Sequence, residues 1–532
     1  MNESASAPTP QPTRPGLTQR LLDWVERAGN KLPQPVTLFA AMIALVLVAS
    51  LVFSLLGTSA EHPGTGETIR AVNLLNAEGI QRIFTQMVTV FTSFPPLGLV
   101  LAVMLGIGVA ERSGLVAAGL KGFVAVVPRR LVTMALVTAG MLSSVAADAG
   151  YVVLIPLGAV IFRSMGRHPL AGLAAAFAGV SGGFGANLFL TGLDPLMAGF
   201  TQPAARMIDP AYTVDPTANW WLLAASVPVV AIAGTYVTER ILEPRLGQWR
   251  PEEGEELPGE VDGGDGAGAD TGDDDQTRDL NATERKALLW ANLTGAAILV
   301  LIAAASIQPG GIFRAEDGSF DPLFAAIVPL MMVLFFIPGL VYGRITGSVK
   351  GDKDVAQMTA GSMADMGAYI VLAFVAAQFV AYFNWSNLGV IFAISGADLL
   401  QSIGFTGIPL IVTFILVSSF INLLIGSASA KWAIMAPIFV PMLMLMGYSP
   451  ELTQAAYRIG DSYSNILTPL LPYFPLIIVF AQKYQKDLGI GTIISLMLPY
   501  AIVFAIARIV MLVIWMLIGL PIGPDAPLEY TP

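Results

Sequence analysis

Long apolar runs recur along the chain, and they constrain its fold more than any other feature. A helix needs about 20 mostly apolar residues to cross a bilayer. Of the 532 residues 55% are hydrophobic and 12% charged, and the mean hydropathy is +0.69. We therefore predict an all-α polytopic membrane protein with about nine transmembrane helices. The expected spans are 36–56, 95–111, 218–239, 287–305, 322–342, 364–384 and 492–519, plus 170–200 and 453–484, which polar and Gly-rich stretches interrupt.

The formal net charge of −10 owes much to one segment. Residues 252–275 read EEGEELPGEVDGGDGAGADTGDDD, which is acidic, rich in Gly and free of aromatic residues. This composition predicts a disordered linker rather than a binding domain. The chain has no Cys and only two His, His62 and His168. Disulfides and thiolate chemistry are excluded, and a His-based metal centre is not expected.

Charge and hydropathy divide the chain into five parts. Residues 1–16 are rich in Pro and Ser without an apolar centre, so we expect a tail and not a signal peptide. Residues 17–32 place apolar side chains beside Arg20, Arg27 and Lys31, which predicts an interfacial helix. The five parts are a cytoplasmic tail with this helix at 1–35, a first membrane repeat at 36–246, the acidic cytoplasmic linker at 247–284, a second membrane repeat at 285–520 and a tail at 521–532.

Two apolar regions are too long for one crossing and are broken in the middle by small and polar residues. Residues 131–166 contain SSVAADAG and residues 408–447 contain GSASAK. Each region is either two helices joined by a short loop or a re-entrant hairpin whose tip stops at mid-membrane. With the N-terminus in the cytoplasm, twenty Lys and Arg residues lie inside and four outside, a strong positive-inside bias. Two crossing helices and a re-entrant hairpin give the same number of basic residues on each side. Only the polar residues in the middle of each region therefore favour hairpins.

An internal similarity relates the two regions. Residues 146–157, AADAGYVVLIPL, align with residues 427–438, SASAKWAIMAPI, so that Tyr151 matches Trp432 and Pro156 matches Pro437. A Gly-rich or polar break follows in the next span of each half, with Asn187 and Asn465 in comparable places. The two units enter from opposite sides of the membrane in the expected topology. This pattern predicts an inverted-topology repeat, in which broken helices meet at a substrate and ion site near the midplane.

Several stretches of both halves resemble one family. The chain is similar to the aminobenzoyl-glutamate transporter (AbgT) family of the ion-transporter superfamily. The stretches that carry the resemblance are GIGVAERSGL (106–115), ANLFLTGLDPL (186–196), YFNWSNLG (382–389), INLLIGSASAKWAIMAPIFVPM (421–442) and AAYRIGDSYSNILTPL (455–470). The main departure from the family pattern is the long acidic linker.

The resemblance implies both a fold and an activity. It implies a homodimer of nine-span protomers with two opposed hairpins in a bacterial inner membrane, the N-terminus being cytoplasmic, with membrane lipid as its surroundings. It implies cation-coupled transport of p-aminobenzoyl-glutamate, a folate breakdown product, and some members are similar to exporters of sulfonamides. The substrate pathway that the resemblance implies falls on Asp194, Ser429, Trp432, Pro450, Arg458 and Asp461.

The chemistry of these residue types suits an aromatic acid. Trp432, beside the expected second tip, offers an aromatic face and one N–H donor to an aminobenzoyl ring, or is an ordinary packing aromatic. The Arg458 fork suits a carboxylate, and Asp461, three residues on, lies on the same helical face and is its expected counter-ion. Asp194 lies between a Gly and a Pro, where a proton relay and a helix cap are equally compatible with the sequence.

Cation coupling is expected at the tips and breaks. Asp148, at the first tip, is predicted as a cation or proton site, since a buried carboxylate needs a counter-ion. Hard cations take oxygen ligands, so sodium ligation or simple helix capping both fit the polar side chains there. We interpret Lys431 as a snorkelling or paired base and Arg508 as structural pairing. The predicted coupling residues are Asp148, Asn187, Asn422, Ser427, Asn465 and Thr468, with no cofactor other than a possible sodium ion.

Other functional classes fit the sequence poorly. Ser427 and Ser429 near Lys431 suggest a Ser/Lys enzyme, but the spacings are not S-x-x-K and no G-x-S-x-G is present. A channel needs a continuous polar lining, and an ATP-driven pump needs a phosphate-binding loop that the chain lacks. We predict a secondary transporter that works by alternating access of the hairpin core, with a sodium-coupled dicarboxylate or citrate carrier as the alternative. The sequence leaves open the direction of transport and the choice between proton and sodium.

Overall fold

The structure is a computed structural model that describes residues 35–61, 68–125, 127–146, 150–247, 249, 280–308, 310–316, 318, 320–471, 473–486 and 488–531. The predicted interfacial helix at 17–32 and most of the predicted acidic linker lie outside the described residues. The one sheet of the described chain is a two-stranded antiparallel hairpin of β1 (Ser59–Glu61) and β2 (Thr68–Arg70). Nearly everything else is helical, so the all-α prediction is confirmed.

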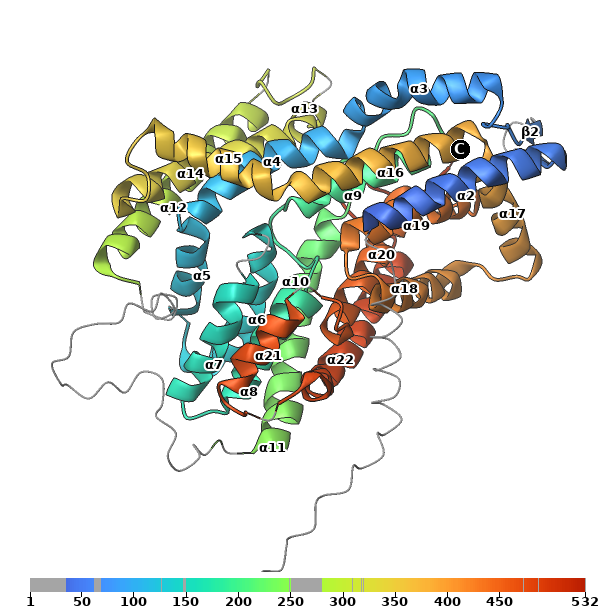
Figure 1. Cartoon of the computed structure of the whole chain (residues 1–532). Coiled ribbons are helices and arrows are strands. Elements are labelled where there is room, and N and C mark those ends of the chain that lie inside the picture. The colour runs from blue at the N-terminus through green and yellow to red at the C-terminus, as the bar shows by residue number, and fades with distance from the viewer. Residues whose placement is uncertain are drawn as a thin grey trace, which may run out of the picture.

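One group of helices packs around α4 (Pro95–Arg112). Next to it lie α14 (Ile327–Thr346) and then α12 (Ala282–Ile307), side by side in Figure 1. The polar helix α15 (Asp352–Asp365) also contacts α4, where Arg112 Nη2 is 2.5 Å from Asp365 Oδ2. Two shorter helices complete the group, α5 (Leu115–Ala125) and α13 (Asp321–Ala325).

A second group is built on aromatic contacts. Its members are α2 (Pro35–Leu55), α3 (Ala77–Thr92), α16 (Gly367–Trp385) and α17 (Leu388–Ser402). The rings of Phe39 on α2 and Phe379 on α16 meet edge to face at 5.7 Å, a favoured geometry for aromatic pairs. Helix α17 contacts β1 and α16. We call these two groups together the scaffold.

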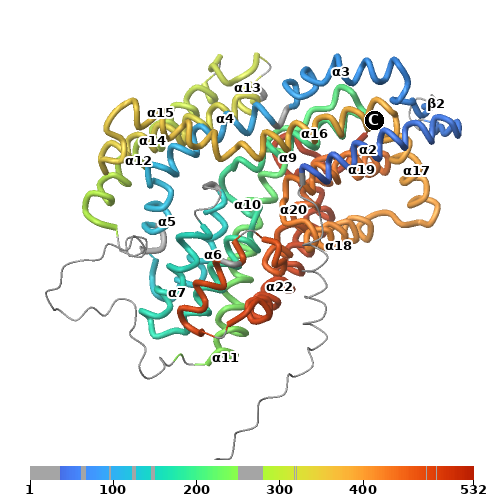
Figure 2. The backbone as a smooth tube through the Cα atoms, in the orientation of Figure 1, coloured from blue at the N-terminus to red at the C-terminus, as the bar shows by residue number. Residues whose placement is uncertain are grey.

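The remaining helices form two sets that we call the core. The first set is α6 (Val132–Leu142), α7 (Ile155–Ser164), α8 (Pro169–Phe177), α9 (Leu193–Ala205), α10 (Trp220–Tyr236) and α11 (Glu243–Leu246). The second set is α18 (Gly407–Leu424), α19 (Ala428–Leu445), α20 (Pro450–Ser464), α21 (Phe474–Gln482) and α22 (Ile490–Ile518). The two sets lie side by side in Figure 2, where α9 contacts α19 and α20, and α10 contacts α22.

Short 3-10 and π segments interrupt the helices of the core. In the first set they are η1 (Arg129–Leu131), η2 (Ser143–Ala146), η3 (Gly150–Leu154), η4 (Ala178–Gly182) and η5 (Val237–Leu242), and in the second set η6 (Asn465–Leu467). Segments η3, η4 and η5 are π-helical. π-turns are rare and are often found at functional sites. Segment η6 falls within the polar break predicted in the second half, residues 459–469, and η4 overlaps the start of the Gly-rich break predicted in the first half, residues 181–192.

In the described part of the chain, nine helices are long and apolar enough to cross a membrane. The number equals the prediction, but the membership differs. Seven of the nine coincide with the predicted simple runs, whereas the other two are the arms of the predicted second hairpin, α18 and α19. The interrupted spans at 170–200 and 453–484 are divided into shorter pieces, α8 with α9 and α20 with α21. Length alone therefore fails to identify helices that are broken within the membrane.

The predicted first hairpin consists of short arms. Helix α6 has 11 residues, about 16 Å at 1.5 Å per residue, which is too short to cross a bilayer core of about 30 Å. It packs closely on η4, because a Cβ added at Gly179 would lie 2.4 Å from the carbonyl oxygen of Val137. Glycine at this crossing lets the broken helix approach α6.

The predicted second hairpin has longer arms. Helices α18 and α19 have 18 residues each and are joined by residues 425–427. Each is about 27 Å long, so length does not distinguish a re-entrant hairpin from two crossings, and the hairpins stay a prediction. The residues 521–531, expected to be a tail, pack on the core: Ser449 Oγ donates to the Pro527 carbonyl at 2.6 Å, and Ile522 is fully buried.

Candidate functional site

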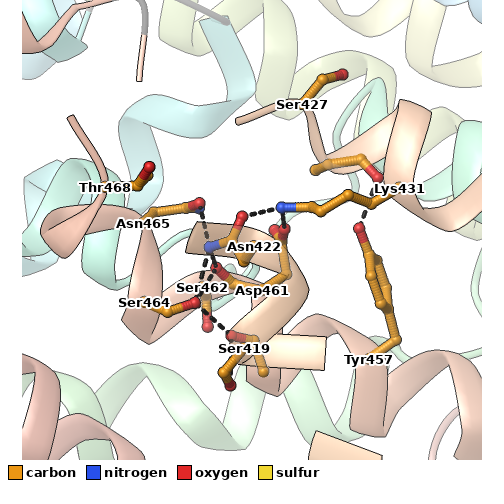
Figure 3. A network of polar contacts seen from close by, with 12 residues as sticks. Ser419, Asn422, Ser427, Lys431, Tyr457, Asp461, Ser462, Ser464, Asn465 and Thr468 are labelled. Atoms are coloured by element: carbon orange, nitrogen blue, oxygen red, sulfur yellow. Dashed lines mark hydrogen bonds and ion pairs between the residues drawn. The ribbon is translucent and has the colours of Figure 1, made fainter. Parts of the chain in front are cut away.

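The broken helices of the two core sets meet around α20. All 15 residues of this helix are buried, although it carries Glu451, Gln454, Arg458 and Asp461. A buried polar helix needs a partner for each charge. Arg458 and Asp461 find their partners on α9 and α19, and these contacts define the candidate site; Figure 3 shows the part around Asp461.

Arg458 forms an ion pair with the first core set. Its Nη1 is 2.7 Å from Oδ1 of Asp194 in the first turn of α9, and both side chains are about 95% buried. Oδ2 of Asp194 also accepts bonds from the backbone N–H and the hydroxyl of Thr191, which precedes α9, at 2.6 and 2.9 Å. Asp194 thus joins the two sets, and its predicted roles as a proton relay or a helix cap stay predictions.

The predicted pairing of Arg458 with Asp461 is wrong. Asp461 pairs with Lys431 of α19, whose Nζ lies 2.5 Å from Asp461 Oδ1 and is fully buried. Spacing of three residues puts Arg458 and Asp461 on one face, but α20 has neighbours all around it, so each charge finds a partner on another helix. Lys431 is therefore a paired base, as one of the two interpretations had it, and it does not snorkel.

An amide and hydroxyl network surrounds the Lys431–Asp461 pair (Figure 3). Lys431 donates to Oδ1 of Asn422, and Asn422 Nδ2 lies within 2.8 Å of the Asp461 carbonyl, Ser464 Oγ and Asn465 Oδ1. The structure thus brings together two residues of the predicted coupling set, Asn422 and Asn465, and the predicted substrate residue Asp461. In this conformation the Lys431 ammonium lies among these oxygens.

Trp432 is fully buried. Its ring stacks on Tyr457 with centroids 4.5 Å apart, and its Nε1 donates to Thr201 Oγ1 of α9 at 2.9 Å. Thr201 in turn donates to Gln454 Oε1 at 2.6 Å, and Gln454 donates to Asn219. One indole face and the N–H are therefore engaged in this conformation, so the predicted substrate contact of Trp432 stays a prediction.

The remaining predicted residues lie at different distances from the two ion pairs. Ser427 caps α19 and is 3.3 Å from Ser429, whereas Thr468 donates to the Leu423 carbonyl at 3.2 Å. Pro450 is the first residue of α20, about 12 Å along the helix from Arg458. It belongs to the helix start and does not touch the ion pairs.

The coupling residues predicted in the first half have a separate location. Asn187 Nδ2 donates to Ser144 Oγ at 2.9 Å, so the break asparagine bonds to the first broken region as Asn465 bonds to Asn422 in the second. Tyr151 stacks on Tyr473 of the second half at 4.4 Å, whereas Trp432 stacks on Tyr457 within its own half, so the two aromatic contacts are not equivalent. The matched asparagine contacts support the predicted repeat. Asp148 lies outside the described residues.

Sequence reasoning missed Thr201, Gln454 and Tyr457. The signal was present, because Gln454, Tyr457, Arg458 and Asp461 fall at i, i+3, i+4 and i+7 and so share one helical face. At the other end of α20, Glu451 Oε2 accepts a bond from the Tyr212 hydroxyl at 2.9 Å. Burial raises the pKa of Tyr212, a residue of the α9–α10 loop, and the nearby Glu451 adds to this effect. Tyr212 therefore remains a donor at physiological pH.

Comparison with known proteins adds to this geometry. The model of a family described as the AbgT putative transporter family matches residues 20–530. The chain is 39% identical over 508 residues, 95% of this chain and 96% of the relative, to the p-aminobenzoyl-glutamate transport protein of Escherichia coli strain K12.

Two solved structures are similar over nearly the whole chain. The Alcanivorax borkumensis YdaH transporter is 42% identical with a TM-score of 0.85, over 92% of this chain and all of the other. Neisseria gonorrhoeae MtrF, described as illuminating a class of antimetabolite efflux pumps, is 48% identical with a TM-score of 0.87, over 96% of this chain and all of the other.

Proposed function

The chain belongs to the AbgT putative transporter family, and from that premise we propose that it transports p-aminobenzoyl-glutamate and related aromatic acids, coupled to a proton gradient. It is a multi-pass membrane transporter and not an enzyme, in agreement with the transport proteins to which it is similar. The observation that carries the proposed substrate is the buried Arg458, which holds a single carboxylate where the broken helices of both core sets meet.

The Arg458–Asp194 pair explains how the site accepts an organic acid. A guanidinium binds carboxylates through two parallel N–H groups, whereas Arg458 uses only Nη1 on Asp194, and its buried Nε has no partner in the described part of the chain. A substrate carboxylate thus competes with Asp194 for the fork. The Trp432–Tyr457 stack joins α19 to α20, the helix that carries Arg458, and rearrangement of this stack presents an aromatic face to the aminobenzoyl ring.

Coupling by protons follows from the position of Lys431. A sodium ion needs oxygen ligands, and in this conformation Asn422 Oδ1 and Asp461 Oδ1 are engaged by the Lys431 ammonium. We assign the coupling proton to this pair: protonated Lys431 holds Asp461, and loss of the proton weakens the contact. Sodium coupling, the other possibility, requires Lys431 to leave these oxygens. Asn187, Asn465, Ser427 and Thr468 are then helix caps and orienting groups.

The transport cycle is alternating access of the core against the scaffold. The matched contacts of the two halves support opposed repeats, and opposed repeats with broken helices move as bodies around a central site. The arms at 131–166 and 408–447 act as re-entrant gates in this scheme. We propose a homodimer held by the scaffold in a bacterial inner membrane, with the N-terminus in the cytoplasm, because the basic residues are concentrated on that side.

Export of sulfonamides is the second activity that we propose. MtrF is described as a member of a class of antimetabolite efflux pumps, and sulfonamides share the aminobenzene ring of p-aminobenzoate. One gradient-coupled site can work in either direction, so import of p-aminobenzoyl-glutamate and export of sulfonamides need no separate machinery. A dicarboxylate or citrate carrier would not need the aromatic pair at Trp432 and Tyr457.

The test is flux of radiolabelled p-aminobenzoyl-glutamate and of a labelled sulfonamide in proteoliposomes, with pH and sodium gradients imposed separately. We expect flux driven by the pH gradient, inhibition by the other aromatic compound and none by citrate. Flux that needs sodium would replace the proton assignment. Citrate transport without aromatic transport would overturn the proposed substrate class.

A further inference from the structure

Arg508 is a buried charge without an assigned partner. It is the only charged residue in α22, a 29-residue apolar helix, and it is 1% exposed. Its Nη1 donates to Ser462 Oγ of α20 and weakly to the Phe184 carbonyl at 3.5 Å, and its Nε has no partner in the described residues. No carboxylate of the described residues forms an ion pair with it. The structural pairing predicted for Arg508 therefore has no acidic partner among the described residues.

Among the described residues, the charges around the two breaks do not cancel. Three cations, Lys431, Arg458 and Arg508, are buried there with two carboxylates, Asp194 and Asp461. The remaining buried carboxylate of α20, Glu451, lies at the far end of that helix and is bonded to Tyr212. A buried charge in a membrane protein is costly and is a functional candidate by default. Within the part of the chain that the structure describes, one positive charge is therefore available to an anion.

Both guanidinium groups adjoin the same break. Gly185 has φ +86°, and a Cβ there would lie 3.7 Å from Arg458 Nε, while the carbonyl of the preceding Phe184 is the acceptor of Arg508. Ser462, the other partner of Arg508, lies four residues after Arg458 on the same face of α20. Two forks, each with an unpartnered buried Nε, are thus directed to the 184–185 turn from α20 and α22.

We propose that Arg508 and Ser462 form a second anion subsite, which binds one carboxylate of a dicarboxylic substrate while Arg458 binds the other. The proposal rests on the proposed function and deepens it. A glutamyl group carries two carboxylates, so two cationic forks distinguish p-aminobenzoyl-glutamate from monocarboxylic analogues of the same ring and amide. Arg508 is then a specificity-determining residue, and a monoanionic sulfonamide uses Arg458 alone.

The test compares two ligands that differ by one carboxylate. Equilibrium binding of p-aminobenzoyl-glutamate and of p-aminohippurate, its glycine counterpart, is measured on the purified full-length protein. In Arg508→Gln we expect the Kd for p-aminobenzoyl-glutamate to rise at least about tenfold and that for p-aminohippurate less than about threefold, since a charge-assisted bond to one carboxylate is lost. Arg508→Lys should restore part of the preference, and Ser462→Ala should weaken it in the same direction.

The matched control is Arg245→Gln. Arg245 also bonds to α22, through the Ser495 hydroxyl at 2.7 Å and its carbonyl at 3.2 Å, but it is exposed and far along the helix. Both Kd values should stay within about twofold. If the Kd values for both ligands rise equally in Arg508→Gln, and Arg508→Lys restores neither, Arg508 is a structural residue and the proposal is overturned. Unchanged Kd values in Arg508→Gln would also overturn it. A wild-type protein that binds neither ligand instead rejects the proposed function itself.

Discussion

The two buried ion pairs of the site are chemically alike but join different parts of the molecule. Asp194 and Arg458 connect α9 of the first core set with α20 of the second, whereas Lys431 and Asp461 connect α19 and α20 within the second set. Only the first pair thus spans the contact between the two sets, where a substrate would enter. We therefore infer that the Asp194–Arg458 pair opens for a substrate carboxylate, and that the Lys431–Asp461 pair stays together and exchanges a proton.

Of the variants considered, removal of Arg458 should reduce transport the most. In Arg458→Ala we expect transport of p-aminobenzoyl-glutamate to fall at least about 100-fold, because truncating one partner of a buried charge pair costs about 2–5 kcal/mol. Asp194 is then left as a buried charge, which lowers the free energy of unfolding by about 3–5 kcal/mol. The double variant Arg458→Met with Asp194→Asn should recover thermal stability but not transport. Full transport in either variant would place the site elsewhere.

Neutralising the other pair should separate coupling from binding. In Lys431→Met with Asp461→Asn, counterflow exchange of p-aminobenzoyl-glutamate should stay within about threefold of wild type, under 1 kcal/mol. Accumulation driven by a pH gradient should be lost, since the proton carrier is gone. Both are measured in proteoliposomes, with Arg458→Ala as the variant in which exchange also disappears. Normal pH-driven accumulation would remove this pair from the coupling mechanism.

The Trp432–Thr201 hydrogen bond also joins the two sets, but it is neutral. It therefore separates the effect of charge from the effect of joining the sets. Trp432→Ala removes the ring and should abolish transport, whereas Trp432→Phe keeps the ring and loses only the N–H donor. A neutral hydrogen bond contributes about 0.5–1.5 kcal/mol, so Trp432→Phe should reduce transport by about tenfold or less. Thr201→Val removes the acceptor of this bond and also the bond from Thr201 to Gln454, so it should reduce transport at least as much as Trp432→Phe. Surface-expression measurements exclude loss of protein, and full activity in Trp432→Ala would exclude the aromatic contact.

The smallest effect is expected for an ion pair outside the core. Arg112 and Asp365 join α4 and α15 within the scaffold, and their side chains are 38% and 64% exposed. Such pairs contribute about 0–1 kcal/mol. Arg112→Gln should therefore change neither transport nor the unfolding temperature appreciably. A loss of transport like that of Arg458→Ala would mean that charge pairs matter wherever they lie, and not because they join the two core sets.

The sequence was sufficient for the membrane class, the positions of the simple spans and most of the site. The apolar runs predict the membrane class and the positions of the simple spans. Charged residues within apolar segments predict the site, since Asp194, Lys431, Arg458 and Asp461 all form its ion pairs. Helical spacing alone gave the wrong counter-ion for Arg458, because it describes one helix and says nothing of the neighbours packed on its other faces.

Other features could not be predicted from the amino-acid sequence alone. The polar helix α15 lacks an apolar run, and α17, at 15 residues, is shorter than a span, so neither is marked by hydropathy. The contact of Thr201 with Trp432 joins residues 231 positions apart, and only the packing of α9 on α19 brings them together. Whether an 18-residue arm crosses the bilayer or turns back depends on its depth, which its composition does not determine.

The central claim is that the core moves past the scaffold during transport, and a disulfide between the two tests it most directly. A Cβ added at Gly396 of α17 would lie 3.7 Å from Cγ of Met442 on α19, and the same distance separates a Cβ at Gly295 of α12 from Cγ of Pro338 on α14, within the scaffold. Cysteines at either pair are within disulfide reach, and the chain has no native Cys.

Flux of p-aminobenzoyl-glutamate in proteoliposomes is compared before oxidation, after it and after reduction. We predict that oxidised Gly396→Cys with Met442→Cys loses transport and regains it on reduction, while oxidised Gly295→Cys with Pro338→Cys transports throughout. Undiminished transport by the fully cross-linked Gly396–Met442 variant would contradict the account.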